Sequence, residues 1–175
     1  MIPEGFLPLL TKEQIADRVT EMAAELAAEY FDRPTTFVGV LDGALFFLTD
    51  LIRATGMDVQ VDFLRLTCYH GRESSRDLHF LSGLTWNVSE RHIVLIDDIL
   101  DSGKTLSFCI EHMRAQGAQS VACAVLLAKE RRREYPVDKP YIGFTIPDRF
   151  VIGYGLDWDG RYRHLPEIYY REKQA

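Results

Sequence analysis

The chain has 175 residues, of which 47% are hydrophobic and 26% charged, which suffices for one domain and scarcely for two. Its 26 Asp and Glu residues outnumber its 20 Lys and Arg residues, and the formal net charge of −6 disfavours a polyanionic partner such as nucleic acid. The longest strictly apolar run, 121–128, is far shorter than the roughly 20 residues of a membrane helix, so no membrane protein is expected either.

Three widely spaced cysteines, Cys68, Cys109 and Cys123, include no C-x-x-C pair. An odd number of cysteines without that spacing is typical of reduced, packed thiols and of a reducing compartment. No basic segment precedes the short apolar stretch 6–10, which argues against a signal peptide. We therefore expect a soluble, cytoplasmic protein.

The first part of the chain predicts alternating helices and strands. Thr11-Lys12-Glu13-Gln14 has the form of a capping box, and it begins a helix that the apolar spacing extends to about Tyr30. A β-branched strand follows over 36–41, then a turn and a helix over 44–54. An alternating strand over 59–69 comes next.

The middle of the chain resumes this pattern after a polar interruption. Residues 70–77 have no periodicity and are expected to form a mobile loop, with 78–81 as its returning strand. The apolar runs 92–96 and 120–128 have the composition of buried parallel strands, and 106–116 is the helix between them. The alternation predicts an α/β fold with a parallel-sheet core flanked by helices, and ligands beyond the carboxyl ends of the strands.

The last third of the chain differs in composition. Its predicted strands, 141–144 and 150–154, are short and lie among Pro, Gly and Asp, so they are expected to form a lid and not a second domain. We expect a single domain over 1–175, with a core over about 35–130 and a C-terminal hood segment over about 140–175.

The most informative stretch runs from a buried strand into Asp97 and Asp98, then through Asp101 and a loop of small residues into a helix. Unpaired backbone N–H groups and hydroxyls over 102–105, where that helix begins, suit a phosphate monoester. Paired carboxylates suit vicinal ribose hydroxyls, directly or through Mg²⁺. The stretch therefore offers a phosphate site beside a sugar site.

Each part of this stretch also has a plainer interpretation. An Asp-Asp pair at a strand end also occurs as a helix cap or a solvated turn. Ser102-Gly103-Lys104-Thr105 is not a Walker A loop, because Asp98 stands where that motif has its first Gly. The order of the whole string, and not any one part, gives it specificity.

The string from Ile96 to Thr105 resembles the binding motif for phosphoribosyl pyrophosphate (PRPP) of the type I phosphoribosyltransferases. Other segments resemble the hypoxanthine-guanine branch of that family, and together they cover nearly the whole chain. These segments are Val61-Asp62-Phe63 leading to Tyr69, Leu127-Ala128-Lys129, Gly143 to Asp148, Phe150 to Asp157, and Arg161-Tyr162-Arg163. The resemblance implies the type I phosphoribosyltransferase fold with a small hood formed by terminal segments. It also implies Mg²⁺-dependent transfer of 5-phosphoribosyl from PRPP to N9 of hypoxanthine or guanine, giving IMP or GMP, in purine salvage.

The resemblance also assigns a role to individual residues. The ribose and its 5′-phosphate would be bound by Asp97, Asp98, Asp101, Ser102, Gly103, Lys104 and Thr105, and pyrophosphate by Leu41, Asp42, Gly43 and Arg163. The purine would be bound by Lys129, Arg149, Phe150 and Val151, and Mg²⁺ by Asp97, Asp98 and Asp157. Asp101 would in addition be the catalytic proton acceptor at purine N7, a role that suits a carboxylate.

Two positions depart from the family pattern. Cys68-Tyr69 stands where a Ser-Tyr pair usually starts the mobile catalytic loop, here about 68–82, which would close over the reacting sugar. Asp42 stands where many members have Lys, in a loop with a cis peptide before that Lys. Since a carboxylate beside pyrophosphate is unfavourable, Asp42 is expected to point away from it, toward a subunit neighbour or a basic side chain.

The remaining charged groups carry less information. Arg131-Arg132-Arg133 is expected to be a solvated turn, and the five histidines show no metal-ligand spacing, so no zinc site is expected.

An alternative function is a regulator of the same fold that senses nucleotides without turnover. A phosphate-accepting signalling domain would leave 150–163 unexplained. The family usually forms homodimers or homotetramers, and the sequence does not decide between them.

Overall fold

The computed structural model describes residues 2–70 and 76–172, and side-chain environments for 2–67 and 78–172. The elements, in chain order, are β1 (Phe6–Leu10), α1 (Lys12–Tyr30), β2 (Thr35–Leu41), α2 (Leu45–Thr55), β3 (Gln60–His70), β4 (Arg76–Ser82), β5 (His92–Leu100), α3 (Lys104–Ala115), β6 (Ser120–Lys129), β7 (Tyr141–Ile146), β8 (Val151–Ile152) and β9 (Ile168–Arg171). None of the described helices is long and apolar enough to cross a membrane.

The first helix, α1, forms where the capping box predicts it. Thr11 Oγ1 accepts a hydrogen bond from the Gln14 N–H (3.3 Å), and the Gln14 side chain accepts one from the Thr11 N–H (2.9 Å). The apolar residues of the predicted face are all buried: Ile15, Val19, Met22, Leu26 and Tyr30. Arg18, on the same helix, donates to the carbonyls of Ile142 (2.9 Å) and Gly143 (3.1 Å), which fastens α1 to β7.

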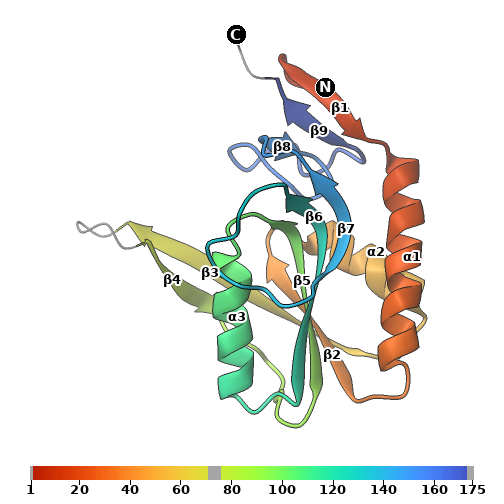
Figure 1. Cartoon of the computed structure of the whole chain (residues 1–175), viewed down its shortest axis with the longest axis vertical. Helices are drawn as coiled ribbons and strands as arrows, with labels where there is room; N and C mark the ends of the chain where they lie inside the picture. The colour runs from red at the N-terminus through yellow and green to blue at the C-terminus, as the bar shows by residue number, and fades with distance from the viewer. Residues whose placement is uncertain (1, 71–75, 173–175) are drawn as a thin grey trace.

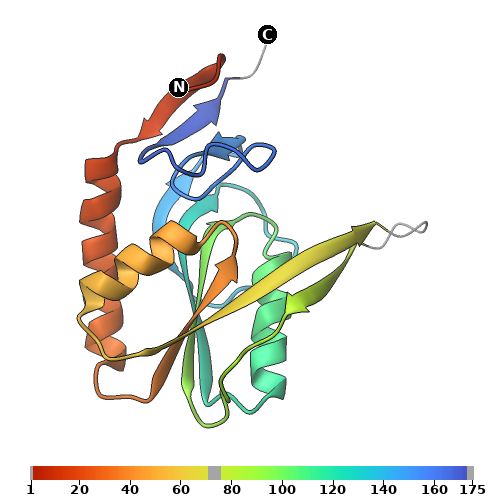
Figure 2. The ribbon, with the colours of Figure 1, turned by 180° about the vertical axis from the view of Figure 1, so that it is seen from behind.

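The main sheet has the order β4-β3-β2-β5-β6-β7, with β2, β3, β5, β6 and β7 parallel and β4 antiparallel to β3. Helices α1 and α2 cover one face and α3 the other (Figures 1 and 2). Side chains of β5 alternate accordingly, since Val94 and Ile96 pack with α1 and α2 while Ile93 and Leu95 pack with α3. The predicted parallel-sheet core flanked by helices is confirmed.

A second, smaller sheet has the order β1-β9-β8 and is antiparallel, so it joins the two terminal parts of the chain (Figure 1). Sequence analysis did not predict β1 or β9 as strands. It also placed 141–144 in the hood, which is wrong, because β7 pairs in parallel with β6 in the main sheet. The predicted strand over 150–154 is reduced to β8, residues 151–152.

The expected mobile loop over about 68–82 is partly a β-hairpin. Strands β3 and β4 pair antiparallel with Cys68 opposite Leu78, so strand structure continues well past the predicted start of the loop. Residues 71–75 and the side chains of Cys68 and Tyr69 lie outside what the structure describes.

The buried carboxylate of Asp62 holds the connection between β4 and β5. Its Oδ1 accepts from the Phe63 N–H (2.8 Å), and its Oδ2 accepts from the N–H groups of Thr85 (2.7 Å) and Trp86 (2.9 Å). Three N–H donors compensate the buried charge, so Asp62 serves the fold.

Two of the three cysteines lie in the core, as predicted for reduced, packed thiols. Cys109 on α3 and Cys123 on β6 are buried and free. Burial, with a smaller contribution from the charge of Asp97, raises the pKa of each thiol to about 12.

Candidate active site

The predicted acidic pair lies at the carboxyl end of β5. The strand continues to Leu100, so Asp97 and Asp98 belong to it, and Asp97 is only 7% exposed. The Asp98 N–H donates to Asp97 Oδ1 (3.0 Å). Burial, and then the charge of Asp98, raises the pKa of Asp97 well above its ordinary value, and burial raises that of Asp98 as well. A dehydrated carboxylate pair of this kind favours a cation or hydroxyl donors as its ligand.

The predicted phosphate loop leads directly into α3. Gly103 is the N-cap with φ = 85°, and an added Cβ would overlap the Tyr135 carbonyl oxygen, so only glycine fits. The Lys104 N–H donates to Ser102 Oγ (3.3 Å). A cavity of about 60 Å³ is lined by this loop and its flanks, namely Asp97 and Ile99 to Leu106. It presents the amide-rich end of a helix, which suits an anion.

Two loops meet at two glycines beside the acidic pair at the end of β5. A Cβ added to Gly43, in the loop after β2, would overlap Asp98 Oδ2. One added to Gly155, where φ is 101°, would overlap the Gly43 carbonyl oxygen. The Leu41–Asp42 peptide bond is cis. The predicted pyrophosphate loop 41–43 therefore lies against the carboxylate of Asp98.

Asp42 has the basic partner that its sequence position predicts. Its Oδ2 lies 3.0 Å from Arg65 Nη2, and both side chains are about half exposed. Parallel pairing of β2 with β3 places Arg65 beside Leu41, which brings the guanidinium within reach.

Arg163 connects Asp157 to the glycine contact. Its Nη1 donates to the Gly155 carbonyl oxygen (2.5 Å), and its Nη2 lies 2.9 Å from Asp157 Oδ1. Asp157 Oδ2 accepts from the Gly160 N–H (2.8 Å). The charge of Arg163 also offsets part of the effect of burial on the pKa of Asp98. Within the described residues, no group of three or more His, Cys, Asp and Glu could hold a metal ion, so the three predicted metal ligands do not form a complete site by themselves.

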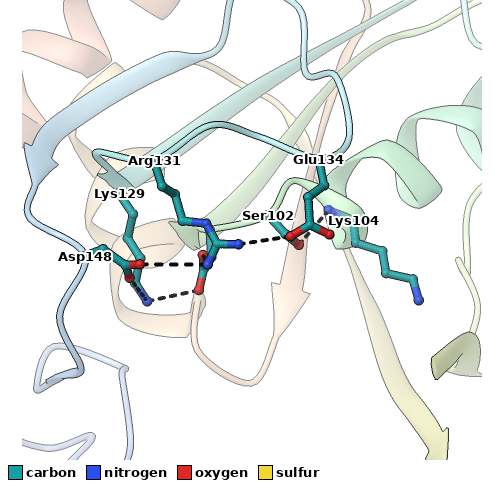
Figure 3. A network of polar contacts seen from close by, with 7 residues as sticks. Ser102, Lys104, Lys129, Arg131, Glu134 and Asp148 are labelled. Carbon is teal, nitrogen blue, oxygen red and sulfur yellow. Dashed lines mark hydrogen bonds and ion pairs between the residues drawn. The ribbon is translucent and has the colours of Figure 1, made fainter. Parts of the chain in front are cut away.

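A network of charges that includes Lys129, Arg131 and Asp148 (Figure 3) contacts the predicted catalytic residue, Asp101. Lys129 Nζ lies 3.0 Å from Asp101 Oδ2 and 3.1 Å from Asp148 Oδ1. Arg131 Nη1 lies 2.9 Å from Asp101 Oδ1, and Arg131 Nη2 lies 3.0 Å from Glu134 Oε1. Desolvation alone would lower the pKa of Lys129, but its hydrogen bonds and charge interactions with Asp101 and Asp148 raise it above the ordinary value.

This network extends one expectation and adds three residues. Arg131 lies at an exposed bend after β6, as expected, but its guanidinium also contacts Asp101, which the expectation of a solvated turn did not include. Arg131, Glu134 and Asp148 were not predicted as site residues. The sequence could have indicated Arg131, because it stands two residues after Lys129, at the carboxyl end of β6. Ligand sites of parallel sheets lie beyond the carboxyl ends of the strands.

Of the predicted purine residues, Lys129 ends β6 in the main sheet, and the other three lie in or next to the small sheet. The Phe150 ring is 46% exposed and meets Phe6 edge to face at 6.3 Å between centroids. The Arg149 guanidinium lies 4.8 Å from the centroid of the Tyr170 ring, and Val151 is buried and pairs with Tyr170. Of these predicted contacts, Phe150 therefore presents the open aromatic face.

Sequence comparison links the chain to proteins of known function. The profile of the family described as phosphoribosyl transferase domain matches residues 8–159. The hypoxanthine-guanine phosphoribosyltransferase of Bacillus subtilis is 40% identical over 161 residues, which cover 91% of this chain and 89% of that protein. The bifunctional protein TilS/HprT of Listeria innocua is 37% identical over the same share of this chain, but the chain spans only 25% of its length.

Solved structures agree with the sequence comparison. A hypoxanthine phosphoribosyltransferase from Staphylococcus aureus superposes with a TM-score of 0.89 at 34% identity, covering 95% of this chain and 91% of that one. A hypoxanthine-guanine phosphoribosyltransferase from Bacillus anthracis gives 0.86 at 31% identity, covering 93% and 95%. The fold, the order of the motifs and the likeness along nearly the whole chain lead to one conclusion: the chain belongs to the hypoxanthine-guanine phosphoribosyltransferase branch of the phosphoribosyl transferase family.

Proposed function

We propose that the chain transfers the 5-phosphoribosyl group of PRPP to N9 of hypoxanthine or guanine, forming IMP or GMP and releasing pyrophosphate, in purine salvage. The observation that carries the proposal is the junction of β5 and α3, where a buried carboxylate pair, a phosphate-binding loop and Asp101 follow one another. The names of the relatives support the same reaction. The comparisons do not favour a regulator without turnover.

Different groups of the chain bind the ribose, the 5′-phosphate and the pyrophosphate of PRPP. Asp97 and Asp98 accept hydrogen bonds from the ribose hydroxyls, while the backbone N–H groups and hydroxyls over 102–105, with Lys104, bind the 5′-phosphate. Pyrophosphate takes the backbone donors of 41–43 and the guanidinium of Arg163. Because Asp42 is paired with Arg65, its carboxylate is partly neutralised beside this anion.

The acidic groups suit Mg²⁺ that arrives with substrate oxygens as its other ligands. The buried pair Asp97 and Asp98 offers hard oxygen ligands with raised pKa values, which a divalent cation would keep ionised. Asp157, which pairs with Arg163 at 2.9 Å, would be a separate ligand. When bound, Mg²⁺ would neutralise the departing pyrophosphate.

The base lies between Phe150, which stacks on it, and Lys129, which donates to its 6-oxo group. The raised pKa keeps Lys129 a cationic donor, and an amino group at that position would leave the ammonium without an acceptor, so 6-oxopurines are favoured over adenine. Val151 and Arg149 contribute at the base edge. Asp101 accepts the proton at N7, and the hairpin of β3 and β4, with Cys68 and Tyr69 in β3, would exclude water.

The test is incubation with PRPP, Mg²⁺ and one purine at a time, followed by separation of the nucleotides. We expect IMP from hypoxanthine, GMP from guanine and no AMP from adenine. If no base gives a nucleotide, the enzyme proposal is wrong. The same assay after removal of Mg²⁺ with a chelator should show no product.

Substitution of the catalytic carboxylate tests its role. Asp101→Ala should lower kcat by roughly 10²–10⁴-fold, because proton transfer is lost, while the affinity for PRPP falls much less. Asp58→Ala, an exposed carboxylate before β3, is the matched control. Equal losses in kcat and PRPP affinity would show that Asp101 only binds.

The chain is expected to act in the cytoplasm, where its buried free thiols stay reduced, and to form a homodimer or homotetramer. Light scattering during size-exclusion chromatography distinguishes the two assemblies.

A further inference from the structure

Arg131 belongs to a group of five charges at the base end of the site (Figure 3). Two cations, Lys129 and Arg131, face the carboxylates of Asp101 and Asp148, and Arg131 also pairs with Glu134. Lys129 contacts both carboxylates, and Arg131 Nη1 lies 2.9 Å from Asp101 Oδ1 and 3.9 Å from Asp148 Oδ2. The Lys129 side chain is only 15% exposed, whereas those of Asp101 and Asp148 are 41% and 50% exposed, so solvent screens these ion pairs in part.

Arg131 is the cation that contacts Oδ1 of Asp101. Oδ2 of Asp101 accepts a hydrogen bond from Lys129, whereas Oδ1 is shielded from solvent and meets Arg131 in an ion pair without the alignment of a hydrogen bond. The guanidinium therefore offsets the negative charge at this oxygen.

The segment that carries Arg131 is fixed to the phosphate loop. Glu134 accepts from Arg131 Nη2 (3.0 Å), and the N–H groups of Glu134 and Tyr135 both donate to the Ser102 carbonyl oxygen (3.1 Å each). These bonds hold the guanidinium at a set place relative to Asp101.

We propose that Arg131 is a positioning residue that keeps Lys129 available to the purine by neutralising Asp101 and Asp148. This inference rests on the proposed function. Two of the three ammonium donors of Lys129 are engaged by carboxylates, which leaves one for the 6-oxo group. Without Arg131, one ammonium faces two carboxylates, which draw it away from a neutral oxo group, the weaker acceptor.

The experiment compares four proteins: wild type, Arg131→Gln, Asp148→Asn and the double variant. Arg131→Gln should raise the KM for hypoxanthine about five- to tenfold and leave the KM for PRPP within about twofold, because one of the two cations at the base end is lost. Asp148→Asn in the same background removes one carboxylate, so the double variant should return to within about twofold of wild type. Arg131→Lys, which keeps the charge, should lie between wild type and Arg131→Gln. Arg132→Gln is the matched control and should leave both KM values unchanged.

Several outcomes would overturn the inference. They are an unchanged KM for hypoxanthine in Arg131→Gln, an equal rise in both KM values, or a double variant no better than the single one. A wild type that forms no IMP would instead refute the proposed function.

Urea unfolding of the same proteins needs no substrate and tests these charge interactions separately. Arg131→Gln should lower the midpoint, and the added Asp148→Asn should raise it again. A double variant less stable than Arg131→Gln would contradict this role of Arg131. If Arg131→Gln does not fold, Arg131→Lys with and without Asp148→Asn gives the same comparison.

Discussion

Gly43 shows how closely the loops of the site approach one another. A methyl group there would overlap Asp98 Oδ2, so Gly43→Ala must displace either the loop after β2 or the acidic pair. We expect the free energy of unfolding to fall by about 2 kcal/mol and the KM for PRPP to rise. Urea unfolding and steady-state kinetics measure both.

Gly83→Ala is the matched control for Gly43→Ala, because nothing lies within 4 Å of its added Cβ. If the two alanine variants behave alike, the close approach of Gly43 to Asp98 is not what makes glycine necessary at residue 43.

Asp42 carries a negative charge next to the proposed pyrophosphate site. Its ion pair with Arg65 is half exposed, so Asp42→Asn should change the free energy of unfolding by less than about 1 kcal/mol. Arg65 is then released for the anion, and the KM for PRPP should fall about two- to fivefold. Asp58→Asn makes the same change in net charge before β3, at the opposite edge of the sheet, and should leave that KM unchanged. An unchanged KM in Asp42→Asn would rule out an electrostatic penalty from Asp42.

At the level of elements, α1 depends on its capping box. Thr11→Ala removes the acceptor for the Gln14 N–H and should lower the free energy of unfolding by about 1 kcal/mol, measured by urea unfolding. Thr20→Ala, in the middle of the same helix, removes only a bond to the Ala16 carbonyl and should be neutral or slightly stabilising, since Ala favours helix. Equal losses in the two variants would show that the cap contributes nothing of its own.

The elements that sequence analysis predicted are those with local signals. The cap of α1, the apolar runs of β5 and β6, and the turn into α3 are each encoded in a few neighbouring residues. Strands β1 and β9 could not be found that way, because each is stabilised by a partner at the other end of the chain. Strand β7 was misplaced for the same reason, since its pairing with β6 decides its sheet.

The same distinction applies within the site. Asp97, Asp98 and Asp101 to Thr105 lie within nine residues and form a recognisable string, and all of them except Asp98 line one cavity. The contacts of Asp98 with Gly43 and of Asp101 with Arg131 join segments that are far apart in the sequence. The geometry of these contacts depends on how the ends of the strands are placed relative to one another. The spacing of residues in the sequence does not predict that placement.

On the scale of the whole molecule, the small sheet couples the N-terminal strand to the proposed base site. Phe6 is buried, with its ring 5.6 Å from the centroid of Trp158 and 6.3 Å from that of Phe150. Phe6→Ala should lower the free energy of unfolding by about 3 kcal/mol and raise the KM for hypoxanthine about fivefold, because Phe150 loses its support. Phe31→Ala, at a ring that is 66% exposed, is the control. An unchanged KM for hypoxanthine in Phe6→Ala would separate the small sheet from base binding.

The pairing of β1 with β9 also has a consequence for biosynthesis. During translation β1 is made before the strands of the main sheet and β9 after them, so the small sheet closes only after the main sheet can already have formed. The growing chain can thus assemble its phosphate loop while the face that carries Phe150 is still incomplete. Binding of the purine is therefore expected to become possible later than binding of the phosphate.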